Sequence, residues 1–213
     1  MIDPAGIDAL LFDFGGVLVE IDFDRMCARW AELAGRPLHD LKARFTLGEE
    51  YHRHERGEID IAAYCEALRR TLDVDLDDEQ LLDGWQRVFV GEIEPTVRLV
   101  EALRGRIPMY VFSNTNVAHY EHFRHRFAAA LAPFERIFTS HEIGARKPER
   151  AAFERIARET GVAMDRMLFL DDTPANVEGA HAAGMPAVLV RAPADVHEAL
   201  RPWLDVAANR TGT

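Results

Sequence analysis

Residues that can hold a metal ion and a phosphate group stand at the ends of four separate segments of the chain. Asp13 lies near the end of one apolar segment, and Asp171-Asp172 follows another. Carboxylates that are brought together repel each other unless one is protonated or a cation neutralises them. Mg²⁺ suits an oxygen site that keeps waters and takes a substrate phosphate. Ser113 and Lys147 follow two further segments and are of types that donate to phosphate oxygens. If the segments meet, they predict one shared Mg²⁺ beside a phosphate group.

Five short apolar runs are the elements that must position these residues. Four of them are apolar on successive residues, which is typical of strands that helices cover on both faces. Helical patterns between the last four begin near Pro95, Pro148 and Pro174 and end near glycines. The alternation predicts an α/β fold with a parallel sheet, which binds ligands at the carboxyl ends of its strands. The five runs are Ala9–Phe14, Met109–Phe112, Arg136–Thr139 (the least clear), Met167–Leu170 and Ala187–Val190.

One interval interrupts this alternation. About 80 residues between the first run and Pro95 contain no convincing strand, which is too long for a simple connection between two strands. We therefore predict an inserted helical cap over residues 22–92, with the α/β core formed by residues 1–21 and 93–213. The helices expected in the cap are Arg25–Ala34, Asp40–Arg53, Ile61–Leu72 and Glu79–Val90.

Composition excludes several classes of protein. The chain has 213 residues, a formal net charge of −11 and 48% hydrophobic residues, which is ordinary for a globular protein. The acidic balance argues against nucleic acid as a partner. The two cysteines, Cys27 and Cys65, suggest a reducing compartment, and we expect neither a secretory signal nor a membrane span. These features predict a cytoplasmic protein, and its oligomeric state is not predicted.

Four motifs in this order resemble the haloacid dehalogenase superfamily. They are Phe12-Asp13-Phe14-Gly15-Gly16-Val17, Ser113-Asn114, Lys147-Pro148 and Asp171-Asp172, and the inserted helices match the helical type of cap in that superfamily. The resemblance implies a Rossmann-like core, with Asp13 as the nucleophile that forms an aspartyl-phosphate. It also implies Mg²⁺ held by Asp13, the Gly15 carbonyl, Asp172 and, in or near the same shell, Asp171. Ser113, Asn114 and Lys147 would hold the phosphoryl oxygens.

A closer likeness is to the bacterial α-D-glucose-1-phosphate phosphatase branch. It rests on the stretch Tyr51–Ile59, the phrase Gly84-Trp85-Gln86 and the string Ser113-Asn114-Thr115-Asn116. The function predicted is therefore a Mg²⁺-dependent phosphatase of a small phosphorylated metabolite, such as glucose 1-phosphate. Two alternatives stay open, namely a hydrolytic haloacid dehalogenase and a protein that binds a phosphorylated ligand without turning it over.

Gly15 departs from the pattern of most phosphatases of the superfamily, which carry a second Asp there as general acid and base. The loss removes a group of the kind worth about 10²–10⁴-fold in rate. It matters less for a good leaving group, such as the anomeric oxygen of a sugar 1-phosphate. Glu20, Asp22 or a histidine of the cap are the candidates to replace this base.

The cap is expected to supply side chains that contact the substrate. His52 and His54 are candidates, and the alternative is that they are exposed helix residues. Trp85 is expected either to stack on a sugar ring or to pack between cap helices. His119, His122 and His125 recur every three residues, and we expect a solvated helix face there rather than a zinc site.

Overall fold

A five-stranded parallel sheet forms the centre of the computed structural model, which describes residues 3–208. All four pairings in the sheet are parallel, so the predicted α/β fold is confirmed. The strand order β5-β4-β1-β6-β7 places β1 between β4, which ends at Ser113, and β6, which Asp172 follows. The strands are β1 (Ala9–Phe12), β4 (Met109–Ser113), β5 (Arg136–Thr139), β6 (Met167–Asp171) and β7 (Ala187–Leu189).

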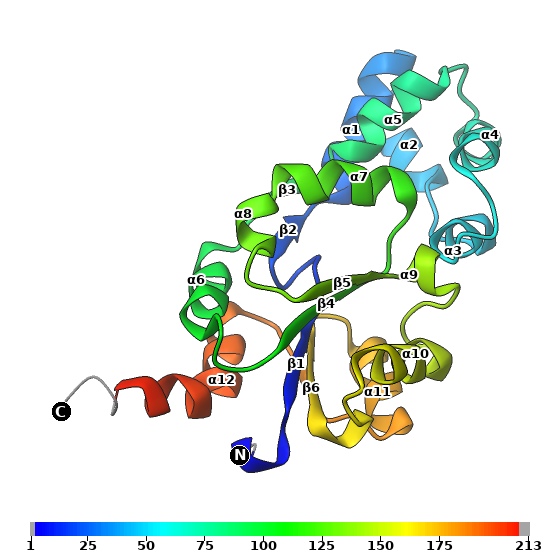
Figure 1. Cartoon of the computed structure of the whole chain (residues 1–213). Coiled ribbons are helices and arrows are strands. Elements are labelled where there is room, and N and C mark those ends of the chain that lie inside the picture. Colours follow the sequence, from blue (N-terminus) through cyan, green and yellow to red (C-terminus); the bar gives the residue numbers. More distant parts are fainter. Residues whose placement is uncertain (1–2, 209–213) are drawn as a thin grey trace.

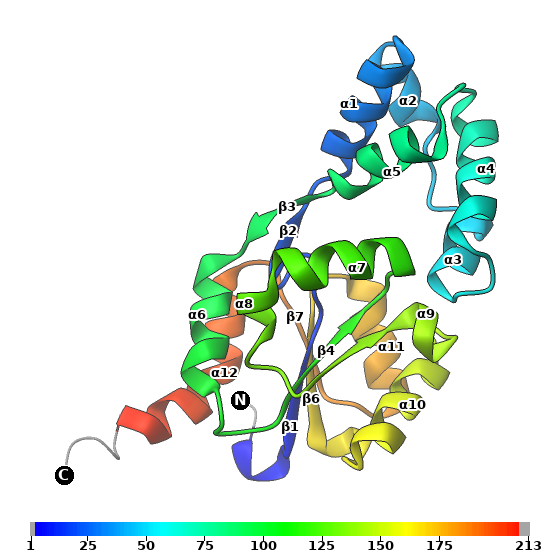
Figure 2. The ribbon, with the colours of Figure 1, turned by 45° about the horizontal axis from the view of Figure 1, so that its top comes forward.

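Helices cover both faces of this sheet, which explains why its central strands are apolar on successive residues. Along β1, Leu10 and Phe12 belong to one buried cluster, whereas Ala9 and Leu11 belong to the other. Figures 1 and 2 show α6 and α12 on one face and α10 and α11 on the opposite face. These helices are α6 (Glu94–Leu103), α10 (Arg150–Thr160), α11 (Pro174–Ala183) and α12 (Pro193–Ala208).

The predicted helix boundaries of the core follow from local chemistry. Pro95 and Pro174 occupy the first turns of α6 and α11, where a missing N–H costs no helical hydrogen bond. Gly161 and Gly184 end α10 and α11 in the left-handed conformation that a side chain would disfavour. The remaining short elements of the core are η1 (Pro4–Gly6), α7 (Val117–Arg126), α8 (Ala128–Leu131), α9 (Ser140–Ile143) and η2 (Met164–Arg166).

The helices of the predicted cap lie between two short strands that the sequence analysis missed. β2 (Val19–Ile21) and β3 (Phe89–Glu92) pair antiparallel and connect the core to the helices at the top of Figure 1. Two predicted helices are corrected: Asp40–Arg53 is divided into α2 and α3, and Glu79–Val90 ends at Gln86 because the chain then enters β3. The helices are α1 (Phe23–Ala34), α2 (Leu38–Arg44), α3 (Glu49–Glu55), α4 (Ile61–Leu72) and α5 (Asp78–Gln86).

Two tryptophans hold the cap helices together. The rings of Trp30 and Trp85 stack with centroids 5.8 Å apart, and Trp30 Nε1 donates to the Leu81 carbonyl at 2.9 Å. α5 approaches α1 closely at Gly84, where a Cβ atom would lie 2.1 Å from Trp30 Nε1. The phrase around Gly84 and Trp85 is therefore explained by packing within the cap.

Candidate active site

Three carboxylates meet at the carboxyl ends of β1 and β6. These strands are neighbours, and the Asp13 amide donates to the Leu170 carbonyl at 2.8 Å. The side chains of Asp13, Asp171 and Asp172 each offer an oxygen within 4.8 Å of the others. Asp171 is fully buried and Asp13 is 8% exposed, whereas Asp172 is exposed. The fold thus brings together acidic residues that are far apart in the sequence.

Lys147 lies between two of these carboxylates. Its Nζ is 2.6 Å from Asp13 Oδ1 and 2.7 Å from Asp171 Oδ2, and it donates to the Phe112 carbonyl at 3.0 Å. Burial alone would lower the pKa of Lys147, but the charges of Asp13 and Asp171 outweigh it and raise that pKa. The lysine is therefore a fixed positive charge at the floor of the site.

The carboxylates carry more negative charge than one lysine neutralises. Burial, followed by the charge of Asp171, raises the pKa of Asp13 well above its ordinary value in spite of Lys147. Burial and Asp171 also raise the pKa of Asp172. A bound cation would neutralise this excess negative charge, and a set of donors that are all oxygen atoms fits a hard ion such as Mg²⁺.

The local geometry indicates which oxygens remain for such a cation. Asp171 already accepts hydrogen bonds from Asn176 Nδ2 at 3.0 and 3.1 Å and from the Thr173 amide at 2.8 Å, besides its ion pair with Lys147. Asp172 is free to approach the loop after β1 because Gly16 has no Cβ, which would lie 2.0 Å from Asp172 Oδ2. Asp13 and Asp172 are therefore better placed to hold the ion than Asp171.

Ser113 is the last residue of β4, and Asn114 follows it beside this cluster. Ser113 is 5% exposed and lines the same cavity as Asp13. Asn114 Nδ2 donates to the Lys147 carbonyl at 3.0 Å, and the Lys147 amide donates back to Asn114 Oδ1 at 2.8 Å. Both ends of the Asn114 amide thus fix the backbone of Lys147, which favours a positioning role over the predicted contact with phosphate.

A cavity of about 570 Å³ lies over this floor, and both cap and core contribute to its wall. Its size is in the range of small-molecule sites. The floor is polar, whereas the part of the wall that includes Phe14, Ile21 and Phe89 is apolar. Tyr51 and Glu55 of α3 and Arg146 of the core add polar groups from the cap side.

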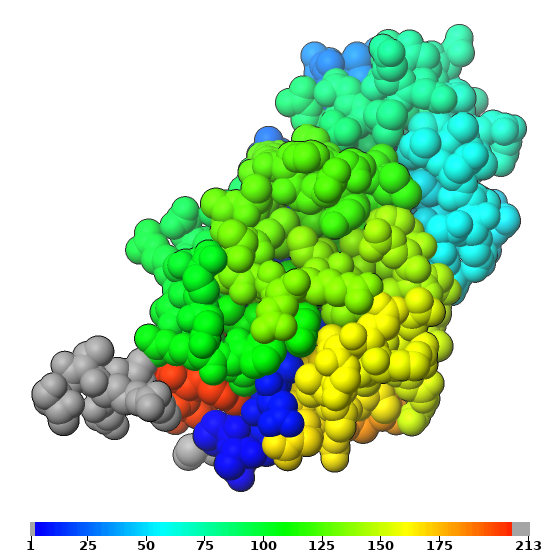
Figure 3. Space-filling view, viewed as in Figure 1, coloured from blue at the N-terminus to red at the C-terminus, as the bar shows by residue number. Residues whose placement is uncertain are grey.

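Two ion pairs tie α3 and the residue that caps its C-terminus, Arg56, to the core on either side of Lys147. Arg146 Nε lies 2.7 Å from Glu55 Oε2, and Arg56 Nη2 lies 2.7 Å from Glu149 Oε1. The α3 segment, in cyan, adjoins the yellow-green core segment in Figure 3. These contacts were not predicted, because residues about 90 positions apart carry no local signal of pairing.

The three predicted substrate contacts from the cap lie outside the lining of the cavity. Trp85 is 1% exposed and stacks on His119, with ring centroids 4.7 Å apart. His54 is 3% exposed and stacks on Tyr64 at 4.5 Å, and His52 is half-buried elsewhere on α3. In this structure Trp85 and His54 therefore pack against other side chains, and none of the three lines the cavity.

The histidines of α7 also differ from the prediction of a solvated face. His119 lines the cavity, and its Nε2 lies 3.1 Å from the Trp85 carbonyl, to which it donates. Burial lowers the pKa of His119 to about 3, so its ring is neutral at pH 7. A neutral imidazole that already donates to a carbonyl is a poor general acid.

The position of the missing acid and base is filled by a different side chain. A Cβ atom on Gly15 would lie 2.9 Å from Ile21 Cγ1, so Ile21 takes up the space next to this glycine. Of the candidates to replace the base, Glu20 lines the cavity. Asp22 instead caps α1, where it accepts from the Asp24 amide at 2.8 Å.

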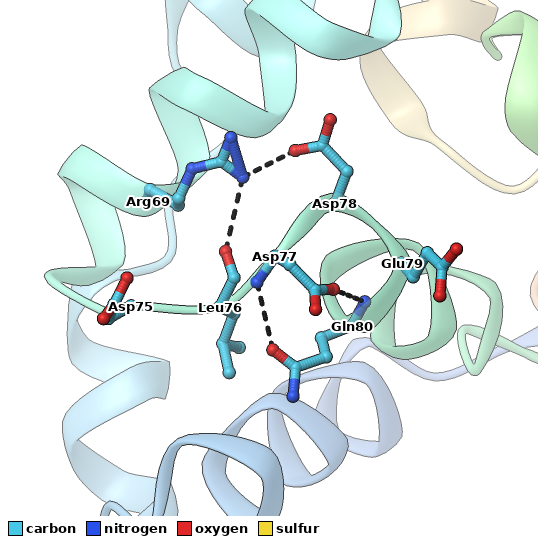
Figure 4. A pocket seen from close by; sticks show the side chains of 7 residues that line it. All are labelled: Arg69, Asp75, Leu76, Asp77, Asp78, Glu79 and Gln80. Carbon is cyan, nitrogen blue, oxygen red and sulfur yellow. Dashed lines mark hydrogen bonds and ion pairs between the residues drawn. The ribbon is translucent and has the colours of Figure 1, made fainter.

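A second, open hollow lies at the start of α5, away from the carboxylates. Figure 4 shows that Arg69 bonds to Leu76 and Asp78 and that Asp77 and Gln80 bond to each other. Arg69 donates to Asp78 at 2.6 Å, and Asp77 and Gln80 form a reciprocal capping box with hydrogen bonds of 2.8 and 3.0 Å. These contacts stabilise the beginning of a helix and explain the acidic residues there without a ligand.

The fold and the site define an α/β enzyme whose functional groups gather at the carboxyl ends of central strands. The chain belongs to the family of haloacid dehalogenase-like hydrolases, whose model matches residues 7–184. This confirms the resemblance at the level of the superfamily and identifies the chain as a hydrolase. Within residues 3–208, none of the helices combines the length and apolar character of a bilayer span.

Individual proteins of this family are similar over most of the chain. Phosphatase MT3486 of Mycobacterium tuberculosis is 28% identical over 193 residues, covering 86% of this chain and 87% of its own length. The D-ribitol-5-phosphate phosphatase of Bacteroides thetaiotaomicron is 25% identical over 183 residues, covering 80% and 85%. A structure of a Bacteroides thetaiotaomicron enzyme of the family, in complex with magnesium and inorganic phosphate, superposes with a TM-score of 0.75 at 24% identity, covering 87% and 95%.

Proposed function

We propose that the protein is a Mg²⁺-dependent phosphatase that hydrolyses a small phosphorylated metabolite through an aspartyl-phosphate on Asp13. The observation that carries this proposal is the cluster of three carboxylates beside Lys147 at the floor of a cavity to whose wall the cap contributes. The phosphatases among its relatives support the same reaction.

The residues of the floor divide the chemistry among them. A carboxylate oxygen of Asp13 attacks phosphorus, and the bond from phosphorus to the leaving oxygen breaks as the new bond to Asp13 forms. Water then attacks the phosphorus of the aspartyl-phosphate, which releases inorganic phosphate and restores the carboxylate. Ser113 donates to the phosphoryl oxygens. Lys147 stabilises them as a nearby positive charge, since its three N–H groups already bond to Asp13, Asp171 and the Phe112 carbonyl. Asn114 fixes the backbone of Lys147.

The metal belongs next to the same oxygens. We assign its protein ligands to Asp13, the Gly15 carbonyl and Asp172, with Asp171 close by and already engaged by Lys147 and Asn176. When bound, Mg²⁺ supplies positive charge that keeps the carboxylates ionised and neutralises the phosphate oxygens.

Gly15 supports a substrate with a good leaving group. No side chain at this position protonates the leaving oxygen, and Ile21 makes the surroundings apolar. The anomeric oxygen of a sugar 1-phosphate leaves more readily than an ordinary alkoxide, so glucose 1-phosphate is the substrate we expect to be preferred. The leaving oxygen then takes its proton from water.

The test is phosphate release from a panel of sugar and polyol phosphates, with Mg²⁺ and with a chelator. We expect release that requires Mg²⁺ and is abolished by Asp13→Asn, whereas Asp75→Asn, the same change in the hollow at the start of α5, retains it.

Two other results each point to a different function. Halide release from a haloacid that a chelator does not inhibit indicates a dehalogenase. Thermal stabilisation by a sugar phosphate without any phosphate release indicates a binding protein. Equal rates for glucose 1-phosphate and for 6-phosphates contradict the argument from Gly15.

A further inference from the structure

Three polar side chains line the cavity on the side of the cap. Tyr51 and Glu55 are four residues apart on α3 and therefore share one face of this helix. Arg146 joins them from the core loop that carries Lys147. Glu55 is only 2% exposed, so its charge lies in the interior of the molecule next to the cavity.

The ion pair between Glu55 and Arg146 leaves hydrogen-bonding groups unused. It joins Nε to Oε2 at 2.7 Å. Within residues 3–208, the terminal nitrogens of Arg146 form no hydrogen bond. The Glu55 carboxylate also accepts from the Tyr51 hydroxyl, a contact that contributes to raising the pKa of Tyr51, and its oxygens can accept further hydrogen bonds. The pair therefore presents donors and an acceptor side by side, and a buried charged group that is incompletely paired is costly unless water or a ligand completes it.

A hydroxyl group is the ligand that matches this arrangement. A hydroxyl both donates and accepts, so it can bond to Glu55 and Arg146 together. A second anionic group on the ligand would gain little from Arg146, because the Glu55 carboxylate already neutralises that charge and repels another anion beside it. An apolar group on the ligand would displace water from both charged side chains and leave them without hydrogen-bond partners. The free-energy cost of such unpaired groups is larger than that of an imperfect apolar contact.

We propose that Tyr51, Glu55 and Arg146 form a subsite that binds the hydroxyl groups of the leaving alcohol. The substrates are then monophosphates of neutral sugars or polyols rather than aryl phosphates or bisphosphates. The inference rests on the proposed phosphatase function and adds to it the part of the protein that selects the alcohol.

The experiment compares glucose 1-phosphate and ribitol 5-phosphate with phenyl phosphate, which carries no hydroxyl group. For Glu55→Gln and Arg146→Lys we expect kcat/KM for the two hydroxylated substrates to fall about 10- to 100-fold, the range of a hydrogen bond to a charged group. We expect kcat/KM for phenyl phosphate to change by less than about threefold, since the floor of the site is unaltered.

Arg56→Gln is the matched control, because it breaks the other ion pair between cap and core. Arg56 does not line the cavity. If Glu55 acts only by anchoring the cap, Arg56→Gln and Glu55→Gln lower all three kcat/KM values together, and the proposal is overturned. Preserved discrimination in Glu55→Gln overturns it as well. Should Glu55→Gln fail to fold, Tyr51→Phe removes one hydroxyl and is expected to lower the same ratio, and an unchanged ratio overturns the proposal.

Failure of the proposed function is visible separately. If the wild-type protein releases phosphate from none of the three compounds with Mg²⁺, the phosphatase assignment is wrong. The subsite is then tested by thermal stabilisation with Mg²⁺ and glucose 1-phosphate. A shift that Glu55→Gln loses supports the subsite, and no shift, or an equal shift in Glu55→Gln, overturns it.

Discussion

Replacing Gly15 with Asp restores the residue that most phosphatases of the superfamily carry, and the structure predicts that this change alone is harmful. The new Cβ would lie 2.9 Å from Ile21 Cγ1 and 3.6 Å from Ile21 Cδ1. The φ angle of Gly15 is not in the left-handed region, so the conflict is one of space and not of backbone strain. Overpacking of this kind costs about 1–3 kcal/mol. We expect Gly15→Asp to lower both stability and activity.

Making room at Ile21 should reverse the effect on the rate. General acid catalysis is typically worth about 10²–10⁴-fold. In Gly15→Asp/Ile21→Ala we therefore expect at least a tenfold higher kcat for glucose 6-phosphate, which has an alkoxide leaving group, than in Ile21→Ala. The gain for glucose 1-phosphate should be smaller, because its leaving oxygen needs less protonation.

The assay is steady-state phosphate release for both substrates, together with urea denaturation of all four proteins. Ile21→Ala is the reference, since it carries the cavity change without the acid. The reasoning about space is refuted if Gly15→Asp is as stable as wild type and faster on glucose 6-phosphate. The reasoning about the leaving group is refuted if the double variant gains equally on both substrates.

Three further predictions concern charge and packing. Burial lowers the pKa of His119 from 6.5 to about 3, so only the unfolded state takes up this proton as the pH falls. Urea denaturation should show wild type losing up to about 2.3 kcal/mol more than His119→Asn between pH 6.5 and pH 4.5, and parallel profiles would exclude this. Burial and Asp171 raise the pKa of Asp172, so Asp172→Asn should melt higher than wild type in a chelator at pH 7, and Mg²⁺ should reverse that order. In Gly179→Ala the new Cβ would lie 2.6 Å from the Pro148 carbonyl oxygen. We expect a loss of about 1–3 kcal/mol and lower activity, whereas helix propensity alone predicts a gain.

The sheet and the acidic cluster could be predicted because their signals are local. Each strand of the sheet is a short apolar run, and β5 has the predicted bounds Arg136–Thr139. The carboxyl ends of parallel strands share one edge, so Asp13 and Asp171-Asp172 had to meet once β1 and β6 were neighbours. The roles of the individual site residues were predicted from the order of the four motifs, through the resemblance to the superfamily.

The parts that were missed depend on contacts across the chain. β2 and β3 contain three and four residues, which is too short for a pattern of alternation to be read. Trp85 is equally suited to a sugar ring and to a core, and only its position between α1 and α7 decides for packing. The ion pairs of α3 with the core join residues that no local spacing connects.

Four consecutive residues make the position of the cap and the geometry of the floor interdependent. Arg146 and Glu149 bind α3, and between them Lys147 reaches Asp13 and Asp171. The Lys147 backbone is held in turn by Asn114 at the end of β4. A movement of α3 away from the core must break both ion pairs beside Lys147 or carry this loop with it. Because Lys147 is the positive charge that faces both carboxylates, the position of the cap and the electrostatics of the floor are linked through this loop, and a displacement of α3 as a whole acts on both.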